Sequence, residues 1–206
     1  MNIYHIGKGS MISLKIGRFL HQSPDSYLRP LQNDRSEIMN DIQLLPLTLQ
    51  MAPTLATIAN DKDIWLQVRD RLPHPYHLQD AESFISIVSS QKQQLIRGIF
   101  SEQELCGIIS ITPLHDIHRV SAEIGYFLGK SWWGKGIATT AVSQIIQMAF
   151  ATFPIERIFA GVFSHNKSSM RVLEKNGFIQ EGIARRSVIK ENILLDEHIY
   201  ALYRQI

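Results

Sequence analysis

The stretch EIGYFLGKSWWGKGIATT, residues 123–140, decides the fold of this chain. Its first part, residues 123–128, is rich in Ile, Tyr and Phe, which is typical of a β-strand. From Ile137 onward the apolar residues recur at spacings of three to five, which indicates a helix. Gly134 and Gly136 therefore lie between a strand and the N-terminus of a helix.

This pair of glycines is suited to binding a phosphate group. The N–H groups of a first helical turn have no partner within the helix, and the positive end of the helix dipole lies there. Glycine has no Cβ, so a bulky anion can approach the backbone. The stretch has no GxxxxGK[ST] pattern, and Ala138 and Thr139 rule out a GxGxxG fingerprint. A tight turn without a ligand is the alternative interpretation.

The composition indicates an ordinary globular domain. Of its 206 residues, 45% are hydrophobic and 19% are charged, and the net charge of +2 is too small to indicate a nucleic-acid partner. The single cysteine, Cys106, excludes an internal disulfide and a cysteine-based metal site, and we expect a buried thiol. Scattered histidines without a third ligand predict no metal site. Since no apolar run has the length of a membrane span, we expect a cytoplasmic protein.

Hydrophobic periodicity from residue 42 onward predicts a mixed α/β sheet with flanking helices. The expected elements are a strand at 42–47, helices at 51–60 and 80–91 with a short helical piece between them within 61–71, strands at 95–100, 105–112 and 123–128, a helix from 137 to Pro154, a strand at 157–163, a helix within 164–178 and a hairpin of 182–190 and 193–203. Residues 1–40 show no sustained period. We expect them to form an extension, either packed or loosely ordered, before a domain at 41–206.

Three motifs in this order resemble those of the GNAT superfamily of acyl-CoA-dependent N-acetyltransferases, and most closely its Rim-type ribosomal-protein N-terminal acetyltransferases. They are AEIGY at 122–126, WGKGIA at 133–138, and N-x-x-S at 166–169 followed by VL-x-KNGF at 172–178. The resemblance covers about residues 42–203. Trp133 stands where many members have Gln or Arg. Because this loop acts through backbone N–H groups, the departure weakens the resemblance only a little.

The resemblance implies a mixed, mostly antiparallel seven-stranded sheet, splayed at its centre, that binds acetyl-CoA. The pantetheine arm would pair with the backbone of the strand, and the pyrophosphate would lie on the glycine loop. Asn166 would bind the cofactor near its thiol end, although a simple helix cap is the alternative. The implied cofactor residues are Tyr126, Phe127, Leu128, Trp133, Gly134, Lys135, Gly136, Ile137, Ala138, Thr139 and Asn166.

The resemblance also implies a donor to the leaving thiolate at Ser169, for which a capping serine is the alternative. Glu123 is a candidate general base acting through water, or else a structural carboxylate. The position near the last hairpin that is often glutamate in the Rim branch is Val188 here, with Glu191 three residues later. This departure weakens the transfer of the family's base to this chain.

The acceptor is expected to be a primary amine, either a protein or peptide N-terminus or a small molecule. In this family the segment at about 65–80 borders the acceptor groove, and the candidate acceptor contacts on it are Trp65, Arg69, His74 and Tyr76. The alternative is a loop that packs on its own aromatic side chains. An open groove between 65–80 and 184–198 suits a peptide, and a closed pocket suits a small molecule. A non-catalytic acyl-CoA-binding module is the alternative function. Both a monomer and a homodimer remain open.

Overall fold

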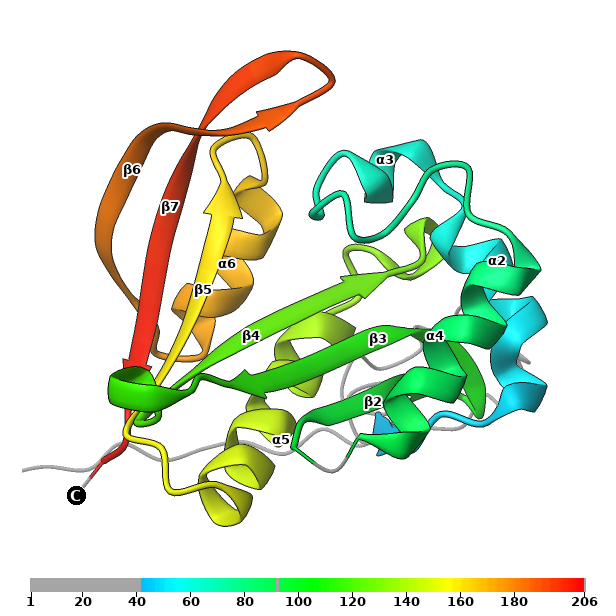
Figure 1. Cartoon of the computed structure of the whole chain (residues 1–206), viewed down its shortest axis with the longest axis horizontal. Helices are drawn as coiled ribbons and strands as arrows, with labels where there is room; N and C mark the ends of the chain where they lie inside the picture. Colours follow the sequence, from blue (N-terminus) through cyan, green and yellow to red (C-terminus); the bar gives the residue numbers. More distant parts are fainter. Residues whose placement is uncertain (1–41, 92, 206) are drawn as a thin grey trace, which may run out of the picture. The chain divides into compact units, whose positions relative to one another are not determined.

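The computed structural model describes residues 42–91 and 93–205, so the expected extension at 1–40 lies outside the described residues. Its centre is a seven-stranded sheet in the order β1-β2-β3-β4-β5-β7-β6 (Figure 1). The strands are β1 (Gln43–Leu45), β2 (Leu95–Ser101), β3 (Glu104–Pro113), β4 (Ser121–Leu128), β5 (Arg157–Phe163), β6 (Ile179–Lys190) and β7 (Ile193–Tyr203). Every neighbouring pair is antiparallel except β4 and β5. The predicted fold class is confirmed.

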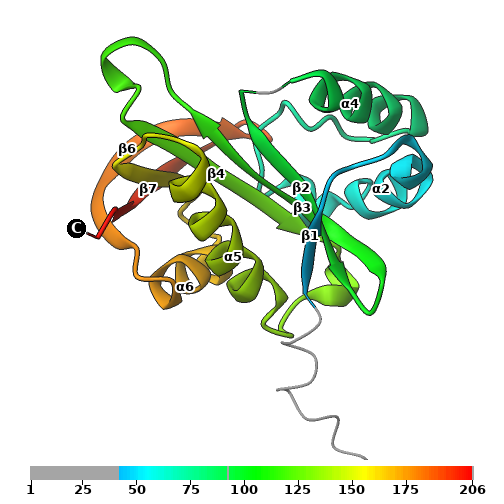
Figure 2. The ribbon, with the colours of Figure 1, turned by 90° about the horizontal axis from the view of Figure 1, so that it is seen from below.

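Helices cover both faces of the sheet. Figure 2 shows α2 and α4 on one face and α5 and α6 on the other. The helices are η1 (Leu49–Met51), α2 (Ala52–Ala59), α3 (Lys62–Trp65), α4 (Leu78–Ser90), η2 (Asp116–His118), η3 (Lys130–Trp132), α5 (Ile137–Thr152) and α6 (Lys167–Lys175). None of them, within the described part of the chain, is both long and apolar enough to cross a membrane.

The sheet splays between β4 and β5, as predicted. These parallel strands pair only from Ser121 with Arg157 to Glu123 with Phe159. Beyond that point β4 continues to Leu128 and β5 to Phe163 while the two strands diverge (Figure 1). The edge of β4 that faces the gap therefore has no partner strand, so its backbone is free to pair with a ligand.

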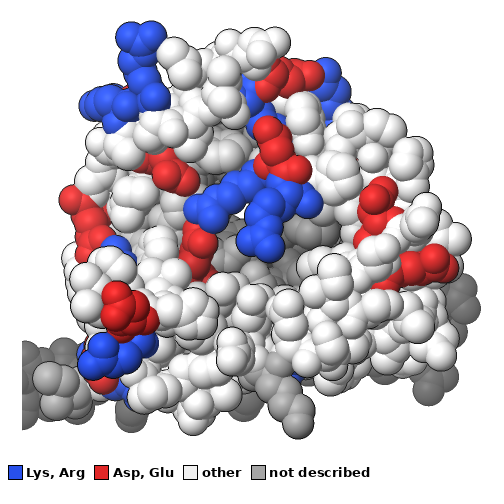
Figure 3. Space-filling model, viewed as in Figure 1, with Lys and Arg blue, Asp and Glu red and all other residues white. Residues whose placement is uncertain are grey.

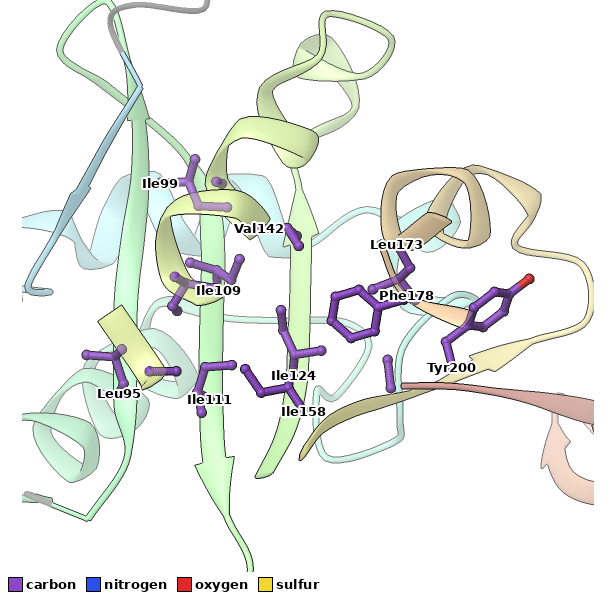
Figure 4. Close-up of a cluster of buried hydrophobic side chains, with 14 of the residues drawn as sticks. Leu95, Ile99, Ile109, Ile111, Ile124, Val142, Ile158, Leu173, Phe178 and Tyr200 are labelled. Carbon is purple, nitrogen blue, oxygen red and sulfur yellow. The ribbon is translucent and has the colours of Figure 1, made fainter. Parts of the chain in front are cut away.

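The main apolar core lies between the sheet and the α5–α6 layer (Figure 4). Ile109 and Ile111 of β3, Ile158 of β5 and Leu173 of α6 are each completely buried. Burying each such side chain contributes about 1.5–3 kcal/mol relative to leaving it exposed. Cys106 belongs to the same core, as predicted, and burial raises the pKa of its thiol to about 11. This core fixes β4, α5 and α6 relative to one another.

Two tight turns join neighbouring strands of the sheet. Glu102 and Gln103 join β2 to β3, and Glu191 and Asn192 join β6 to β7, all four with positive φ between 46° and 66°. Two-residue hairpin turns of this kind match the twist of the flanking strands. The second turn lies where the sequence predicts it, and the first is shorter than expected because the strands extend to its edges.

The short helical piece expected within 61–71 is α3, Lys62–Trp65, which includes Trp65 but ends before Val68. Asp61 caps it, with its side chain accepting from the N–H groups of Asp63 and Ile64. The following residues form turns, and their carbonyl groups bind side chains from distant elements instead of continuing the helix. The prediction was therefore right for Trp65 and wrong for Val68, since periodicity does not reveal such long-range partners.

Candidate active site

A cavity of about 310 Å³ opens where β4 and β5 diverge. Its walls are the end of β4, the loop after it, the N-terminus of α5 and the first turns of α6. The cavity is lined by Tyr126, Phe127, Leu128, Trp133, Gly134, Gly136, Ile137, Ala138, Thr139 and Asn166, all of which the sequence analysis named as cofactor residues. Lys135 is the exception: it does not line the cavity, and its ammonium lies 4.7 Å from the centre of the Trp132 ring.

The glycine loop leaves this cavity open. Gly134 and Gly136 have φ of 75° and 85°, and a Cβ at either position would meet no atom within 4 Å. Gly136 is the N-cap of the 16-residue helix α5 and has no side chain with which to cap it. The first-turn N–H groups and the positive end of the helix dipole therefore face the cavity. This geometry suits the pyrophosphate of a nucleotide cofactor.

Ser169 and Tyr126 contact each other on the wall of the cavity. The Ser169 Oγ lies 2.9 Å from the Tyr126 phenol oxygen, and the phenol also donates to the Ser169 carbonyl at 3.3 Å. Burial raises the pKa of Tyr126 to about 12, although the hydrogen bond with Ser169 opposes this shift. The phenol is therefore neutral and able to donate at physiological pH.

Asn166, not Ser169, caps helix α6. Its side-chain oxygen accepts from the Ser169 N–H at 3.0 Å, as expected of an N-cap residue. The hydroxyl of Ser169 is thus available for other contacts. For Tyr126 the sequence indicated a role of the backbone and not of the side chain, although strand alternation places this side chain on the same face as Ile124, which the α5–α6 layer covers.

A second cavity of about 290 Å³ adjoins the first. The two share Gln67, Val68, Tyr126, Asn166 and Ser169 as lining residues. The second cavity has polar walls, which include hydroxyl groups of β3, and acidic and basic side chains gather on this face of the molecule (Figure 3). The Ser169–Tyr126 pair therefore lies at the junction of a cavity suited to a nucleotide cofactor and a polar cavity suited to an acceptor.

Glu123 lies on the wall of the second cavity and binds Arg69. The guanidinium donates from Nη1 to Oε2 at 3.0 Å and from Nη2 to Oε1 at 2.5 Å. Glu197 is also close, with one carboxylate oxygen 4.0 Å from Nη2 of Arg69. Both oxygens of Glu123 are thus engaged in a bidentate pair that joins β4 to the segment after α3.

The candidate acceptor residues have different surroundings. Arg69 lines the second cavity, whereas Trp65 and His74 line neither cavity and stack on each other with ring centres 5.6 Å apart. Tyr76 is only 4% exposed and belongs to the apolar cluster beneath α2 and α4. Its expected place on the acceptor rim is therefore corrected to a place in the core, where its N–H donates to the Asn60 side chain at 3.0 Å.

The described residues contain no group of three His, Cys, Asp or Glu side chains that could hold a metal ion. The splayed sheet, the glycine loop before α5 and the hydroxyl pair shared by the two cavities agree with the arrangement expected of an acyltransferase that uses a nucleotide thioester. Residues 41–179 match the acetyltransferase (GNAT) domain family. The chain belongs to this family.

Several known proteins resemble the chain. The probable N-acetyltransferase YjcK of Bacillus subtilis is 43% identical over 107 residues, which are 51% of this chain and 59% of that protein. The ribosomal-protein-serine acetyltransferase of Escherichia coli is 30% identical over 143 residues, or 66% of this chain and 78% of that protein. The crystal structure of the microcin C7 self-immunity acetyltransferase MccE with acetyl-CoA and AMP has a TM-score of 0.70 at 27% identity, over 80% of this chain and 93% of that one.

These findings confirm the predicted family, the fold and the enzyme class of acetyl-CoA-dependent N-acetyltransferases, with acetyl-CoA as cosubstrate. The resemblance to ribosomal-protein acetyltransferases is also confirmed at moderate identity. They do not support the alternative of a non-catalytic acyl-CoA-binding module. The match spans 59% of the length of YjcK, so the acceptor and the activity of the whole protein do not follow from this similarity alone.

Proposed function

We propose that this chain transfers the acetyl group of acetyl-CoA to a primary amine at the junction of the two cavities. The thioester lies beside the Ser169–Tyr126 pair, with the pantetheine along β4 and the pyrophosphate on the glycine loop. The amine enters from the cavity lined by Arg69 and Glu123. The observation that carries this proposal is the sharing of Ser169 and Tyr126 by both cavities.

In the proposed reaction the neutral amine attacks the thioester carbonyl carbon. A carbon–nitrogen bond forms, the carbon–sulfur bond breaks, and one proton of the amine must leave. The hydroxyl of Ser169 donates to the sulfur as it leaves. The single O–H of Tyr126 lies within reach of both the carbonyl and Oγ of Ser169, and in this step it turns to Oγ, which directs the serine proton away from the phenol. The amine loses its proton to water, and Ser169 regains from water the proton that it gives to the sulfur. The net reaction therefore moves one proton from nitrogen to sulfur and leaves both side chains unchanged.

For Glu123 we propose that its main role is to hold Arg69. A carboxylate has about four acceptor sites, and the guanidinium occupies two of them. Acting as a base through water would require the remaining sites. In the anchoring role, Glu123 fixes the cavity wall into which the acceptor fits, and bulk water removes the amine proton.

We expect Glu123→Gln to raise KM for the amine about tenfold while kcat changes less than about threefold, because the bidentate pair with Arg69 is weakened. Steady-state kinetics with varied amine at saturating acetyl-CoA measure both constants. Glu197→Gln is the matched control, since its carboxylate is 4.0 Å from the same guanidinium. A fall of about 100-fold in kcat for Glu123→Gln alone would instead identify Glu123 as the base.

The acceptor is proposed to be either a peptide N-terminus or a small-molecule amine. Relatives are named for each kind of acceptor: a ribosomal-protein-serine acetyltransferase, and a spermidine N-acetyltransferase from Vibrio cholerae whose 18% identity supports the fold alone. The polar cavity walls combine two arginines, Arg69 and Arg71, with Glu123, and Glu197 lies 4.0 Å from Arg69, so these formal charges balance and provide no excess of carboxylates for a polycation such as spermine. This charge distribution favours a peptide N-terminus or an amine of low positive charge.

The experiment that tests this function is thiol release from acetyl-CoA with three acceptor panels: peptides with different N-terminal residues, polyamines, and amino acids. Mass spectrometry of the acceptor identifies the acetylated nitrogen. We expect release that depends on both the protein and an amine, with polyamines the poorest panel. Thiol release that no amine accelerates would contradict the proposed transfer.

Two further proposals concern the setting of the enzyme. A cytoplasmic location is proposed because acetyl-CoA, the cosubstrate, is produced and consumed there. We also propose that the acceptor is a protein or a small molecule and not a nucleic acid, because the net charge of +2 is too small to indicate a nucleic-acid partner. Either a monomer or a homodimer is compatible with the site, since all its proposed residues belong to one chain.

A further inference from the structure

The tip of the β6–β7 hairpin shows an inverted pattern of burial. Lys190, the last residue of β6, is 4% exposed, whereas its apolar neighbours Ile189 and Ile193 are 58% and 61% exposed. Lysine is almost never fully buried unless its charge is paired. Specific partners of the ammonium group, and not general apolar packing, therefore keep Lys190 inside.

Within the described part of the chain, the partners of this ammonium group belong to the segment at 65–70. It donates to the Val68 carbonyl at 3.0 Å and to the Asp70 carboxylate at 2.6 Å, and it lies 3.7 Å from the centre of the Trp65 ring. Lysine has three N–H donors, so two hydrogen bonds and a cation–π contact satisfy it. One side chain thus joins the hairpin tip to a segment about 120 positions earlier in the sequence.

This segment forms the wall that the two cavities share. Gln67 and Val68 line both cavities, and Arg69 lines the acceptor cavity and binds Glu123. Helix α3 has ended before these residues, so their position depends on tertiary contacts. Lys190 supplies one such contact on the carbonyl of Val68, and His165 supplies another by donating to the carbonyl of Leu66 at 3.1 Å.

We propose that Lys190 is a positioning residue for the amine acceptor: it holds the 67–69 wall at the width that the acceptor requires. The inference rests on the proposed function, in which the amine occupies the cavity lined by Arg69. Acetyl-CoA depends much less on Lys190, because its proposed main contacts are the glycine loop and β4 on the other side of the junction. A side chain that merely stabilised the hairpin would affect both substrates equally.

The test compares Lys190→Met with Lys62→Met. Methionine retains most of the length of the side chain and its apolar character but cannot donate to Val68 or bind Asp70. Lys62, at the start of α3, also contacts the hairpin tip, by a 2.7 Å ion pair with Glu191, but its side chain is 56% exposed. Exposed pairs of this kind contribute little, so Lys62→Met is the matched control.

For Lys190→Met we expect KM for the amine to rise about tenfold or more, because a buried charged hydrogen bond is lost, while the dissociation constant for acetyl-CoA changes less than about twofold. Lys62→Met is expected to leave both constants unchanged. Lys190→Arg keeps the charge and the donors and should restore most of the affinity for the amine. Hydrogen–deuterium exchange of the amides at 66–70 should accelerate in Lys190→Met and not in Lys62→Met.

Equal losses of amine and acetyl-CoA binding in Lys190→Met would overturn the inference, as would an unchanged KM or an effect matched by Lys62→Met. The exchange measurement needs no substrate. If the wild-type protein acetylates no amine, the proposed function fails, and exchange at 66–70 still decides whether Lys190 holds the segment. Unchanged exchange in Lys190→Met would then overturn the positioning role.

Discussion

Replacing Gly136 by aspartate is expected to weaken acetyl-CoA binding at least about 100-fold, because a like charge next to the pyrophosphate costs several kcal/mol. Gly136 has φ of 85° and open space at the position of its Cβ, so the new carboxylate would lie where we place the phosphates. Asp is among the residues that best tolerate this backbone conformation, so the variant is expected to fold. Isothermal titration calorimetry with acetyl-CoA measures the change.

Two controls separate the causes of that loss. Gly136→Asn has the same shape and backbone strain without the charge, and it should lose much less affinity than Gly136→Asp. Gly182→Asp adds the same charge on β6, at a position where a Cβ also meets no atom within 4 Å, and should leave binding unchanged. Equal affinities for wild type and Gly136→Asp would remove the phosphate-binding role of the loop.

Replacing Ser169 by alanine is expected to lower kcat about 100-fold, the size typical of losing a general acid, with acetyl-CoA affinity preserved. The helix cap survives this change because Asn166 accepts from the backbone N–H of residue 169 and not from its side chain. Single-turnover kinetics separate the chemical step from binding. Ser168→Ala is the matched control, since Ser168 lines only the cofactor cavity.

The partner of Ser169 gives this prediction a second arm. Tyr126→Phe removes the phenol that lies 2.9 Å from Oγ, and it should lower kcat about tenfold by losing the orientation of the serine hydroxyl. Added to Ser169→Ala, the same change should have no further effect, because the hydroxyl that it orients is gone. Additive losses in the double variant would show that Tyr126 and Ser169 act separately. An unaltered kcat in Ser169→Ala would reduce the serine to a structural residue.

Features with a local cause could be predicted from the sequence. The glycines before α5 have the predicted place, and the cap of α6 at Asn166 is the alternative that the sequence offered beside a cofactor contact; both depend on neighbouring residues. The hairpin turn at 191–192 also lies where its two residues indicate. Such signals act within a few positions of the chain, so periodicity and turn chemistry reveal them.

Features that join distant segments could not be predicted in the same way. The Ser169–Tyr126 pair spans 43 positions, the Arg69–Glu123 pair spans 54, and the contact of Lys190 with Val68 spans 122. For Tyr76 the sequence predicted a contact that the structure does not form. An aromatic residue in a proline-rich loop suggests a place on the acceptor rim, but Tyr76 packs in the core. In each case the tertiary arrangement, and not the local pattern, decides what the side chain contacts.

The most direct test of acetyl-CoA binding by this cavity is a thermal melt of the whole chain with and without the cofactor. A ligand at a hundred times its dissociation constant adds about 2.7 kcal/mol, which should raise the Tm of a domain of this size by roughly 5–10 °C. ADP and adenosine serve as controls that lack the pantetheine arm and the thioester. We predict a shift of this size with acetyl-CoA, well above both controls. A shift no larger than theirs would contradict the assignment of the cavity between β4 and α6 to acetyl-CoA.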